Sequence, residues 1–201
     1  MLKSIEPGRS WYQFNSYWPT AFALVATQND DGSPHLAPYQ LVVPFDIAGR
    51  PSIALTTRDG AKTLNNILKN KYCSMNFIES ENMHTEKIIS MGYPRVSYEK
   101  RMKINPFTFI KHENTYIIDE AFQVYKCSFI NKIDSEDVSE GAVHVLLGLD
   151  EILLEEKWLE NTDSMPNMPV TFGYRGRNSF WFAETTNAKG YPVHISKNKD
   201  V

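Results

Sequence analysis

The sequence has few cysteines, no long apolar run and almost no net charge, and each absence excludes a class of protein. Its two cysteines, Cys73 and Cys127, cannot form the disulfide framework of a small secreted domain. Both lie in apolar, strand-like segments, so we expect two reduced, buried thiols. No apolar run approaches the roughly 20 residues that a membrane helix needs, and residues 1–7 lack the apolar stretch of a signal peptide. We therefore expect a cytoplasmic protein without a membrane partner.

The charged residues offer no general attraction to polyanions. Lysine and arginine number 21, aspartate and glutamate number 24, and the formal net charge is -3. Such a chain has no long-range affinity for nucleic acid, so an anionic ligand must be captured locally. Ten acidic residues make residues 131–163 the acidic part of the chain, which we interpret as a solvated face.

The length and the apolar content suit one packed domain, since 42% of the 201 residues are hydrophobic. Strand-like segments dominate, so we predict a mainly β fold, a β-barrel with a few helices. The domain spans residues 1–201, with a flexible lead-in near residues 1–17 and a polar tail near residues 190–201. The expected strands are Ala21–Thr27, His35–Val43, Ser52–Thr57, Tyr72–Ile78, Phe122–Ile133 and Ala142–Leu154, followed by a last strand within residues 172–184.

Glycine and proline punctuate these strands. The residues Asn29–Gly32 predict a tight turn that makes the first two strands an antiparallel hairpin. Pro38 cannot donate a ladder hydrogen bond, so it places part of the second strand at an edge or in an irregular segment. Gly148, within a long apolar run, predicts a bulge or a sharp bend.

Two helices are expected. In Ala61–Lys69 the apolar residues recur at helical spacing, and we expect Asp59 to be the N-cap, with Gly60 permitting the turn. A weaker pattern predicts a second helix over Asn82–Ser90. The polar, proline-interrupted stretch that continues to about Phe109 has no clear assignment.

The junction between the third strand and the first helix has the chemistry of an anion site. A helix start presents unpaired backbone N–H groups and the positive end of the helix dipole. Thr56, Thr57, Arg58 and Lys62 surround this start with hydroxyl groups and positive charge. A phosphate site fits this pattern, and so does a capped surface helix whose charges merely face water. The glycine-rich spacing of a nucleotide-triphosphate loop is absent.

Several short strings stand in the order found in a known family. Ala23–Thr27 and the Asp31-Gly32 turn precede His35-Leu36-Ala37-Pro38-Tyr39-Gln40, and Thr63–Ile67 precedes Met75-Asn76-Phe77. Over residues 19–78 the chain resembles the flavin reductase-like family, whose fold is the FMN-binding split barrel. The family's patterns are Asn-x-Ala-Pro-Tyr-Ser, Lys-Asp-Thr-x-x-Asn-Ile and Val-Asn-apolar.

The resemblance implies a cofactor and partners. Family members are typically homodimers that bind FMN, or FAD in some cases, and many use NAD(P)H as co-substrate to reduce flavin. The resemblance also implies small-molecule substrates and admits an oxygenase as a partner. Aromatic residues near the N-terminus favour a homodimer as well.

The family motifs also assign residues to the cofactor. By the resemblance, the segment from Ala37 to Gln40 lines the flavin, and the junction holds ribityl or phosphate oxygens. Gln40 stands where the family usually has Ser. Ala61-Lys62 stands where it has Lys-Asp, which turns Lys62 about 100° around the helix. The cofactor-binding residues are then Ala37, Pro38, Tyr39, Gln40, Thr56, Thr57, Arg58, Lys62, Thr63 and Asn66.

The remaining candidates receive other interpretations. His144 lies one residue out of the family's His-to-Gly register, so we interpret it as a structural histidine rather than one that faces nicotinamide or relays a proton. Residues 173–177 are interpreted as a Gly-rich loop, and Tyr174 and Trp181 as candidate flavin-edge aromatics. No spacing of His, Cys and carboxylates indicates a metal site, and we assign no catalytic residue.

The sequence therefore predicts a flavin reductase-like oxidoreductase that transfers hydride from NAD(P)H to flavin. The cofactor supplies the difficult chemistry, and the protein has to bind and orient both partners. Two alternatives stay open. One is a non-catalytic flavin-binding electron carrier, and the other is a split-barrel flavin oxidase or oxygenase acting on a small organic substrate.

Overall fold

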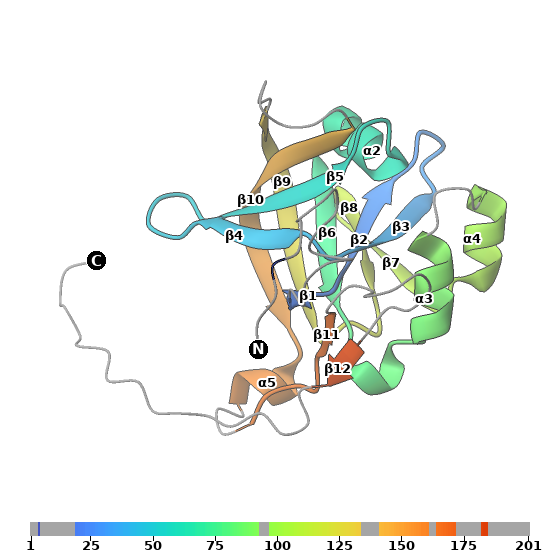
Figure 1. Ribbon diagram of the computed structural model, residues 1–201, viewed down its shortest axis with the longest axis vertical. Coiled ribbons are helices and arrows are strands. Elements are labelled where there is room, and N and C mark those ends of the chain that lie inside the picture. Colours follow the sequence, from blue (N-terminus) through green and yellow to red (C-terminus); the bar gives the residue numbers. More distant parts are fainter. Residues whose placement is uncertain are drawn as a thin grey trace.

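The structure is a computed structural model that describes Ser4 and residues 19–92, 97–133, 141–160, 164–171 and 182–184 (Figure 1). Its strands are β1 Thr20–Ala21, β2 Ala23–Gln28, β3 Pro34–Tyr39, β4 Val42–Asp46, β5 Ser52–Arg58, β6 Tyr72–Phe77, β7 Phe109–His112, β8 Thr115–Ile118, β9 Gln123–Ile133, β10 Ala142–Leu154, β11 Pro169–Thr171 and β12 Phe182–Glu184. Its helices are α2 Lys62–Asn70, the 3₁₀ turn η1 Ser80–Asn82, α3 Thr85–Gly92, α4 Tyr98–Ile104 and α5 Glu156–Glu160.

Seven antiparallel strands form the main sheet, in the order β3-β2-β6-β9-β10-β5-β4. Figure 1 shows this sheet curled into a half-barrel, with α2 at one end and α3 and α4 beside β3. A small sheet, β1-β11-β12, and the β7-β8 hairpin complete the described β structure. The predicted mainly β fold with a few helices is confirmed.

The strand β2, between β3 and β6, is buried on both faces, which explains why its sequence is continuously apolar rather than alternating. Ala23 and Val25 pack into the core inside the half-barrel, together with Leu64 and Ile67 of α2. The alternate residues of β2, Leu24 and Ala26, pack into a second core under α3. The buried members of this second core are Phe22, Leu24, Ala26, Leu36, Ile78, Met83, Ile88, Met91, Phe107 and Ile118.

Two core thiols lie directly opposite each other. Cys73 on β6 pairs with Cys127 on β9, and both are buried free thiols, as the sequence predicted. The neighbouring Cys127 thiol and burial raise the pKa of Cys73 well above its usual value. Because a protonated, enclosed thiol reacts poorly, this pair belongs to the packed core.

Most strand predictions hold, although the predicted strand Ala21–Thr27 is divided between β1 and β2. Ala142–Leu154 is β10 with the expected bounds, and the Asn29–Gly32 turn joins β2 to β3. The single strand predicted over His35–Val43 is wrong, because the chain leaves β3 after Tyr39 and begins β4 at Val42, at the opposite edge of the sheet. Pro38 does lie on the edge strand β3, as its missing N–H requires.

The first helix begins without the predicted cap. Ala61 is the N-cap of α2, and no side chain caps it, so the assignment of Asp59 is wrong. Gly60, at a φ of 69°, lies in a tight turn in which the Ala61 N–H donates to the Arg58 carbonyl at 3.1 Å. Asp59 instead accepts from the N–H of its neighbour Gly60, which draws its carboxylate away from the helix start.

The second helix is shifted from its predicted bounds. Ser80–Asn82 forms a 3₁₀ turn, and α3 runs over Thr85–Gly92 rather than Asn82–Ser90. His84 has a φ of 48°, a left-handed conformation that separates the two helices. The unassigned stretch that follows contains α4, Tyr98–Ile104, with Ser97 as its side-chain cap.

Gly148 is not itself the site of a bulge. It pairs regularly with Ser52 and Ser128, whereas the register shifts of β10 against β9 fall between Leu146 and Leu147 and between Leu149 and Glu151. The two irregularities therefore lie on either side of Gly148 rather than at the glycine itself.

Some expectations lie outside the described residues. These are the lead-in apart from Ser4, the tail, the loop at 173–177, Tyr174 and Trp181. Within residues 172–184 the described part is β12, which pairs with β11. Among the described helices, none has both the length and the apolar character to span a bilayer.

Candidate functional site

The site is organised around the start of α2. β5 ends at Arg58, the three residues 59–61 form a turn, and the helix begins at Lys62. The Asp59 N–H donates to the Gly141 carbonyl at 3.0 Å, which fixes the turn to the start of β10. The end of β5 and the first turn of α2 therefore lie next to each other, as the sequence predicted.

The first turn of α2 has an open surface with the chemistry of an anion site. Ala61 offers no capping side chain, and the first turn contains no acidic residue. The backbone N–H groups at this end thus lack the carboxylate or hydroxyl cap that commonly satisfies them. Arg58 and Lys62 are exposed beside it and add positive charge to that of the helix dipole.

A layer of neutral polar groups lies beneath this surface. Tyr39 Oη and Thr57 Oγ1 are 3.0 Å apart, and His35 Nε2 and Thr63 Oγ1 are 3.1 Å apart. Thr57 and Thr63 are buried, at 6% and 2% exposure. Each of these hydroxyls can rotate to donate or accept, so the layer can adapt to a ligand above it.

The two titratable members of this layer are both held neutral. Burial raises the pKa of Tyr39, against the opposing effect of its hydrogen bonds with Thr57 and Thr63. Burial first, and then the charges of Arg101 and Lys62, lower the pKa of His35 from 6.5 to about 4. At neutral pH the layer therefore presents hydrogen-bonding groups without charge.

The segment Ala37–Gln40 borders the same site. Ala37 is buried in β3, and Pro38, Tyr39 and Gln40 are half-buried. Gly92 at the end of α3 supports this segment, because a side-chain Cβ there would lie 3.1 Å from Pro38 Cγ. The second core thus reaches the underside of the segment that the sequence assigns to the flavin.

The side chain of Asn66 is buried and forms hydrogen bonds within the fold. Its amide donates to Thr27 Oγ1 at 3.0 Å and to Asn29 Oδ1 at 3.1 Å, and the residue is 1% exposed. These bonds tie α2 to the hairpin that carries β3. The side chain is therefore occupied in positioning the two walls of the site.

Thr56 faces away from Thr57, since neighbouring residues of a strand point to opposite faces. Its hydroxyl is 2.8 Å from His144 Nδ1, across the β5–β10 pair. Its backbone N–H donates to the Leu41 carbonyl at 2.9 Å, just beyond Gln40. The hydrogen bond to His144 agrees with the structural role expected of this histidine.

The predicted site residues thus fall into three groups. Arg58, Lys62 and the α2 backbone form the open surface, while Tyr39, Thr57 and Thr63 form the neutral layer under it. Asn66 and Thr56 lie to either side, with side chains engaged elsewhere. His35 was not among the predicted site residues, although it lies in the segment that resembles the family and its partner Thr63 was predicted.

Arg101 was also missed. It lies on α4, in the stretch where no pattern could be assigned, and its charge acts on both His35 and Tyr39. No sequence signal brings α4 to the site, because that placement follows from the packing of α3 on β3. Among the described residues, no group of His, Cys and carboxylates is arranged to hold a metal.

Comparison with known proteins identifies the fold. No family model and no curated protein matches the sequence. Among solved structures, flavoredoxin from Methanosarcina acetivorans is 18% identical with a TM-score of 0.70, over 98% of each chain. An FMN-binding protein from Thermus thermophilus, with bound 1-cyclohex-2-enone, is 14% identical with a TM-score of 0.70, over 96% of this chain and 99% of that one. A 2-nitrobenzoate 2-nitroreductase from Pseudomonas fluorescens is 18% identical with a TM-score of 0.66, over 90% and 89%. The chain therefore has the FMN-binding split-barrel fold.

The donor set suits an FMN phosphate. An uncapped helix start, two exposed cations and a layer of hydroxyls offer hydrogen-bond donors to a dianion and include no carboxylate in the first turn. Phosphate groups are commonly bound at helix starts of this kind. The groups at the start of α2 therefore fit the phosphate of FMN.

Proposed function

We propose that the protein binds FMN at the start of α2 and is a flavin-dependent oxidoreductase. The observation that supports this most strongly is the uncapped first turn of α2, flanked by Arg58 and Lys62 and underlain by neutral hydroxyls. The phosphate would lie on the backbone N–H groups of that turn, with Arg58 as its main side-chain partner and Lys62 as a weaker one. Ala37–Gln40 would border the flavin.

When bound, FMN supplies a ring that accepts and returns a hydride or single electrons. The protein's own residues would hold and orient it. Tyr39 and Thr57 would present hydroxyls to the ligand, and Asn66 would keep α2 and β3 at a fixed separation. Since His35 stays neutral, the positive charge at the site comes from Arg58, Lys62 and the start of α2.

We further propose NAD(P)H as the hydride donor, which makes the protein a flavin reductase-like enzyme. Because nicotinamide and flavin exchange hydride directly, the reaction needs close placement rather than an acid–base pair. This agrees with a site that has cations and hydroxyls but to which we assign no catalytic side chain. FAD as the flavin, an oxygenase as a partner and a cytoplasmic location stay predictions.

A flavin electron carrier is the second candidate, because one protein of the same fold is a flavoredoxin. It would use the same FMN site and differ in its reaction with nicotinamide. An oxidase or oxygenase acting on a small organic substrate stays open as an alternative, and the fold does not distinguish it.

The experiment is an anaerobic stopped-flow measurement. The purified protein is loaded with FMN, freed of excess flavin, and mixed with NADH or NADPH while the absorbance of oxidised flavin is followed. Bleaching that is faster than for free FMN and saturates with the nucleotide supports a reductase. Bound FMN that is not reduced by either nucleotide favours the carrier, and failure to retain or bind FMN at all would refute the proposed function.

A further inference from the structure

A chain of hydrogen-bonded side chains runs under the start of α2. His35 Nε2 lies 3.1 Å from Thr63 Oγ1, and Tyr39 Oη lies 3.0 Å from Thr57 Oγ1. The Tyr39 hydroxyl also forms a hydrogen bond with the Thr63 side chain, which joins the two pairs. We call these four side chains, in the order His35, Thr63, Tyr39 and Thr57, the polar chain. It connects β3, α2 and β5, the three elements around the proposed phosphate position.

The members of the polar chain depend on one another for hydrogen bonds. His35, Thr63 and Thr57 are buried, at 3%, 2% and 6% exposure. Burial raises the pKa of Tyr39, so its hydroxyl keeps its hydrogen. A buried polar group that loses its partner cannot exchange it for water, and the loss is costly. The direction of one hydrogen bond in the chain therefore constrains the direction of the next.

The polar chain can run in two directions, because a hydroxyl donates one hydrogen and a neutral imidazole nitrogen either donates or accepts. If His35 Nε2 carries the hydrogen, it donates to Thr63. Thr63 then donates to Tyr39 and Tyr39 to Thr57, which leaves the Thr57 hydroxyl able to donate outside the chain. If His35 Nε2 accepts instead, every bond reverses, and Thr57 offers a lone pair.

His35 is the member that fixes the direction. The hydroxyls rotate readily, whereas a change of imidazole tautomer moves a proton from one ring nitrogen to the other. Burial first, and then the charges of Arg101 on α4 and Lys62 on α2, lower the pKa of His35, so at neutral pH the ring is neutral and has a tautomer. His35 stands where the motif Asn-x-Ala-Pro-Tyr-Ser has Asn, a residue without tautomers. This control of direction is thus a feature of the present chain.

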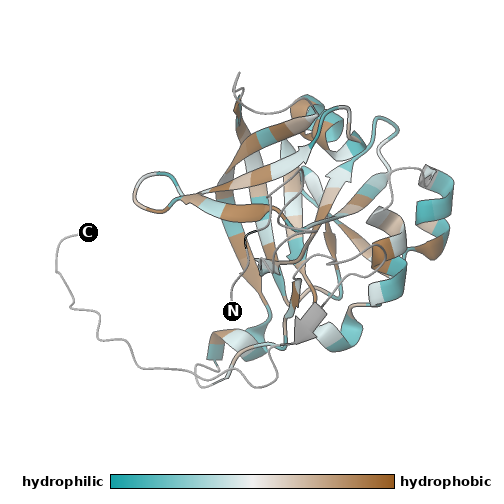
Figure 2. Cartoon of the chain, in the orientation of Figure 1, coloured by the Kyte–Doolittle hydropathy of each residue, from teal (hydrophilic) through white to brown (hydrophobic). Residues whose placement is uncertain are grey.

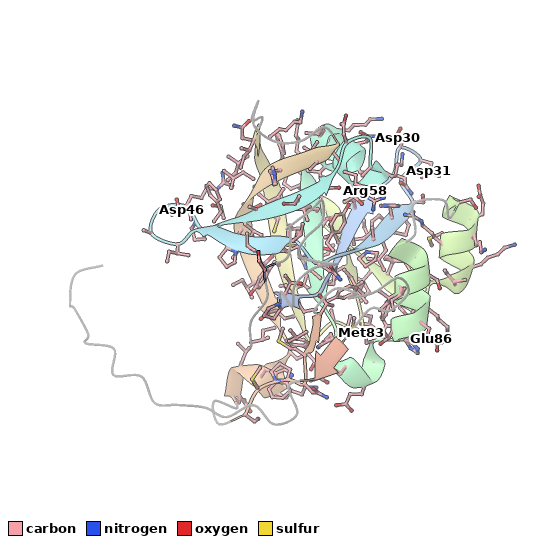
Figure 3. The ribbon with its side chains drawn as sticks, in the orientation of Figure 1. Asp30, Asp31, Asp46, Arg58, Met83 and Glu86 are labelled. Carbon is pink, nitrogen blue, oxygen red and sulfur yellow. The ribbon has the colours of Figure 1, made fainter. Side chains whose placement is uncertain are left out.

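Thr57 brings the far end of the polar chain to the proposed phosphate position. It directly precedes Arg58, the exposed cation beside the first turn of α2, and Figure 3 shows Arg58 lying toward α2. A phosphate dianion accepts hydrogen bonds and donates none, and a lone pair directed at it would repel it. Only the direction that begins with a hydrogen on His35 Nε2 therefore suits this ligand.

We propose that His35 is a positioning residue that, with its hydrogen on Nε2, directs the polar chain so that the Thr57 hydroxyl donates to a phosphate oxygen of bound FMN. The coupling of His35 to Thr57 is a property of the protein alone. Its use in binding the phosphate rests on the proposed function. The two parts are therefore tested separately.

The coupling is tested on the protein without FMN, by the nitrogen NMR signals of the His35 ring, which are assigned by their loss in His35→Asn. Thr57→Val removes a hydroxyl that bonds Tyr39 rather than His35, and we expect it to shift the ring signals through the chain. Thr115→Val is the matched control, because Thr115 is 3% exposed on β8 and its Oγ1 has no hydrogen-bond partner among the described residues. Ring signals that Thr57→Val shifts no more than Thr115→Val does would overturn the coupling.

The effect on the ligand is tested by FMN affinity, with circular dichroism to show that each variant is folded. We expect Thr57→Val and His35→Leu each to weaken FMN binding about fivefold to tenfold, since each removes one charge-assisted hydrogen bond to the phosphate. The double variant should bind no more weakly than Thr57→Val, because His35 acts through Thr57. If His35→Leu does not fold, Thr63→Val interrupts the chain at its next member and replaces it in the same comparison.

The conservative variant separates this role from a merely structural one. His35→Asn should stay within about twofold of the wild-type affinity, since its amide can still donate to Thr63. A loss in His35→Asn as large as in His35→Leu would overturn the proposal. So would a His35→Leu variant with unchanged affinity, or one that weakens binding equally with and without the Thr57 hydroxyl.

The direction itself is read from the His35 ring in the FMN complex. We expect Nε2 to carry the hydrogen and Nδ1 to lack it, and the opposite tautomer would overturn the proposed direction. A wild-type protein that binds no FMN would refute the proposed function and, with it, the contact between Thr57 and the phosphate. The shift of the ring signals by Thr57→Val would still decide whether His35 and Thr57 are coupled.

Discussion

The guanidinium of Arg50 occupies the space that a side chain at residue 148 would need. A Cβ on Gly148 would lie 2.5 Å from Arg50 Nη2 and 2.6 Å from its Cζ. In this position Arg50 donates to Ser128 Oγ at 2.9 Å and to Asp150 Oδ1 at 3.1 Å. Gly148 thus allows the side chain of Arg50, which lies between β4 and β5, to cross β10 and reach β9.

Gly148→Ala should therefore displace Arg50 and break both of its hydrogen bonds. Because Arg50 and Asp150 are 57% and 40% exposed, we expect a loss of only about 0.5–1 kcal/mol in the free energy of unfolding. Arg50→Ala should cost a similar amount, and the double variant should cost no more than either single one, since both remove the same contacts. Urea unfolding measures all three, and additive losses would show that Arg50 is not what Gly148 accommodates.

Replacing Arg58 or Lys62 tests the phosphate position. We expect Arg58→Ala to weaken FMN binding about tenfold, because a charge-assisted hydrogen bond is worth about 1.5–3 kcal/mol and an exposed one less. Lys62→Ala should weaken it by about twofold to fivefold, and both losses should shrink at high salt. Lys69→Ala is the control, since Lys69 is on the last turn of the same helix and pairs with Asp30. Equal effects at all three positions would place the phosphate elsewhere. Flavin fluorescence gives the affinities.

His35 should make the fold sensitive to acid. Its pKa is about 4 in the folded protein and 6.5 when exposed, so the unfolded chain binds the proton more readily. Above pH 6.5 the group is neutral in both states and has no effect. As the pH falls from 6.5 to 4 the folded state loses stability, by up to about 3 kcal/mol at roughly 1.4 kcal/mol per unit.

The substitution His35→Asn should flatten this loss, since an amide can still bond Thr63 but does not titrate. His84→Asn is the matched control, because His84 is exposed and its φ of 48° suits asparagine. Unfolding is measured between pH 4 and 7 for each protein. An unchanged pH dependence in His35→Asn would contradict the assignment of the effect to His35.

The parts of the fold that the sequence predicted are those set by local rules. The Asn29–Gly32 turn, the apolar run of β10 and the helical spacing of α2 all depend on residues that are neighbours in the chain. The break between β3 and β4 depends instead on β5 supplying a partner for Val42, which no local pattern reveals. Figure 2 shows hydrophobic residues along β4 and its loop, so the apolar pattern resumes after the break.

The site divides in the same way. Thr57, Arg58 and Thr63 are close in sequence, so a strand–turn–helix reading brings them together. His35 and Arg101 reach the site through tertiary packing, and the Asp59 carboxylate accepts from the Gly60 N–H rather than capping α2. The chemical character of the junction was therefore predictable, whereas the contributions of His35 and Arg101 were not.

Asn66 should matter for stability more than for ligand contact. Its amide is 1% exposed and satisfies both Thr27 and Asn29, so Asn66→Ala should lower the free energy of unfolding by about 2–3 kcal/mol. Asn65→Ala, at the exposed neighbouring position, should change it by less than about 0.5 kcal/mol. Urea unfolding gives both values. An effect of Asn66→Ala on FMN affinity with no loss of stability would instead make Asn66 a direct ligand of the cofactor.

The β4–β5 hairpin is where we expect a second copy of the chain to bind. Val43, Phe45 and Ile47 are 47%, 58% and 88% exposed, and they lie on the edge strand β4 and its loop. Exposed apolar residues at alternate positions of an edge strand share one face, which is unusual in a monomer and typical of an interface. The paired substitutions Phe45→Glu and Ile47→Asp should convert a dimer into a monomer, measured by light scattering at micromolar concentration. Leu159→Asp is the control, because Leu159 is 65% exposed but lies on α5. A wild-type protein that is monomeric at this concentration would contradict the homodimer. A dimer that persists with both Phe45→Glu and Ile47→Asp would show that its interface lies away from β4.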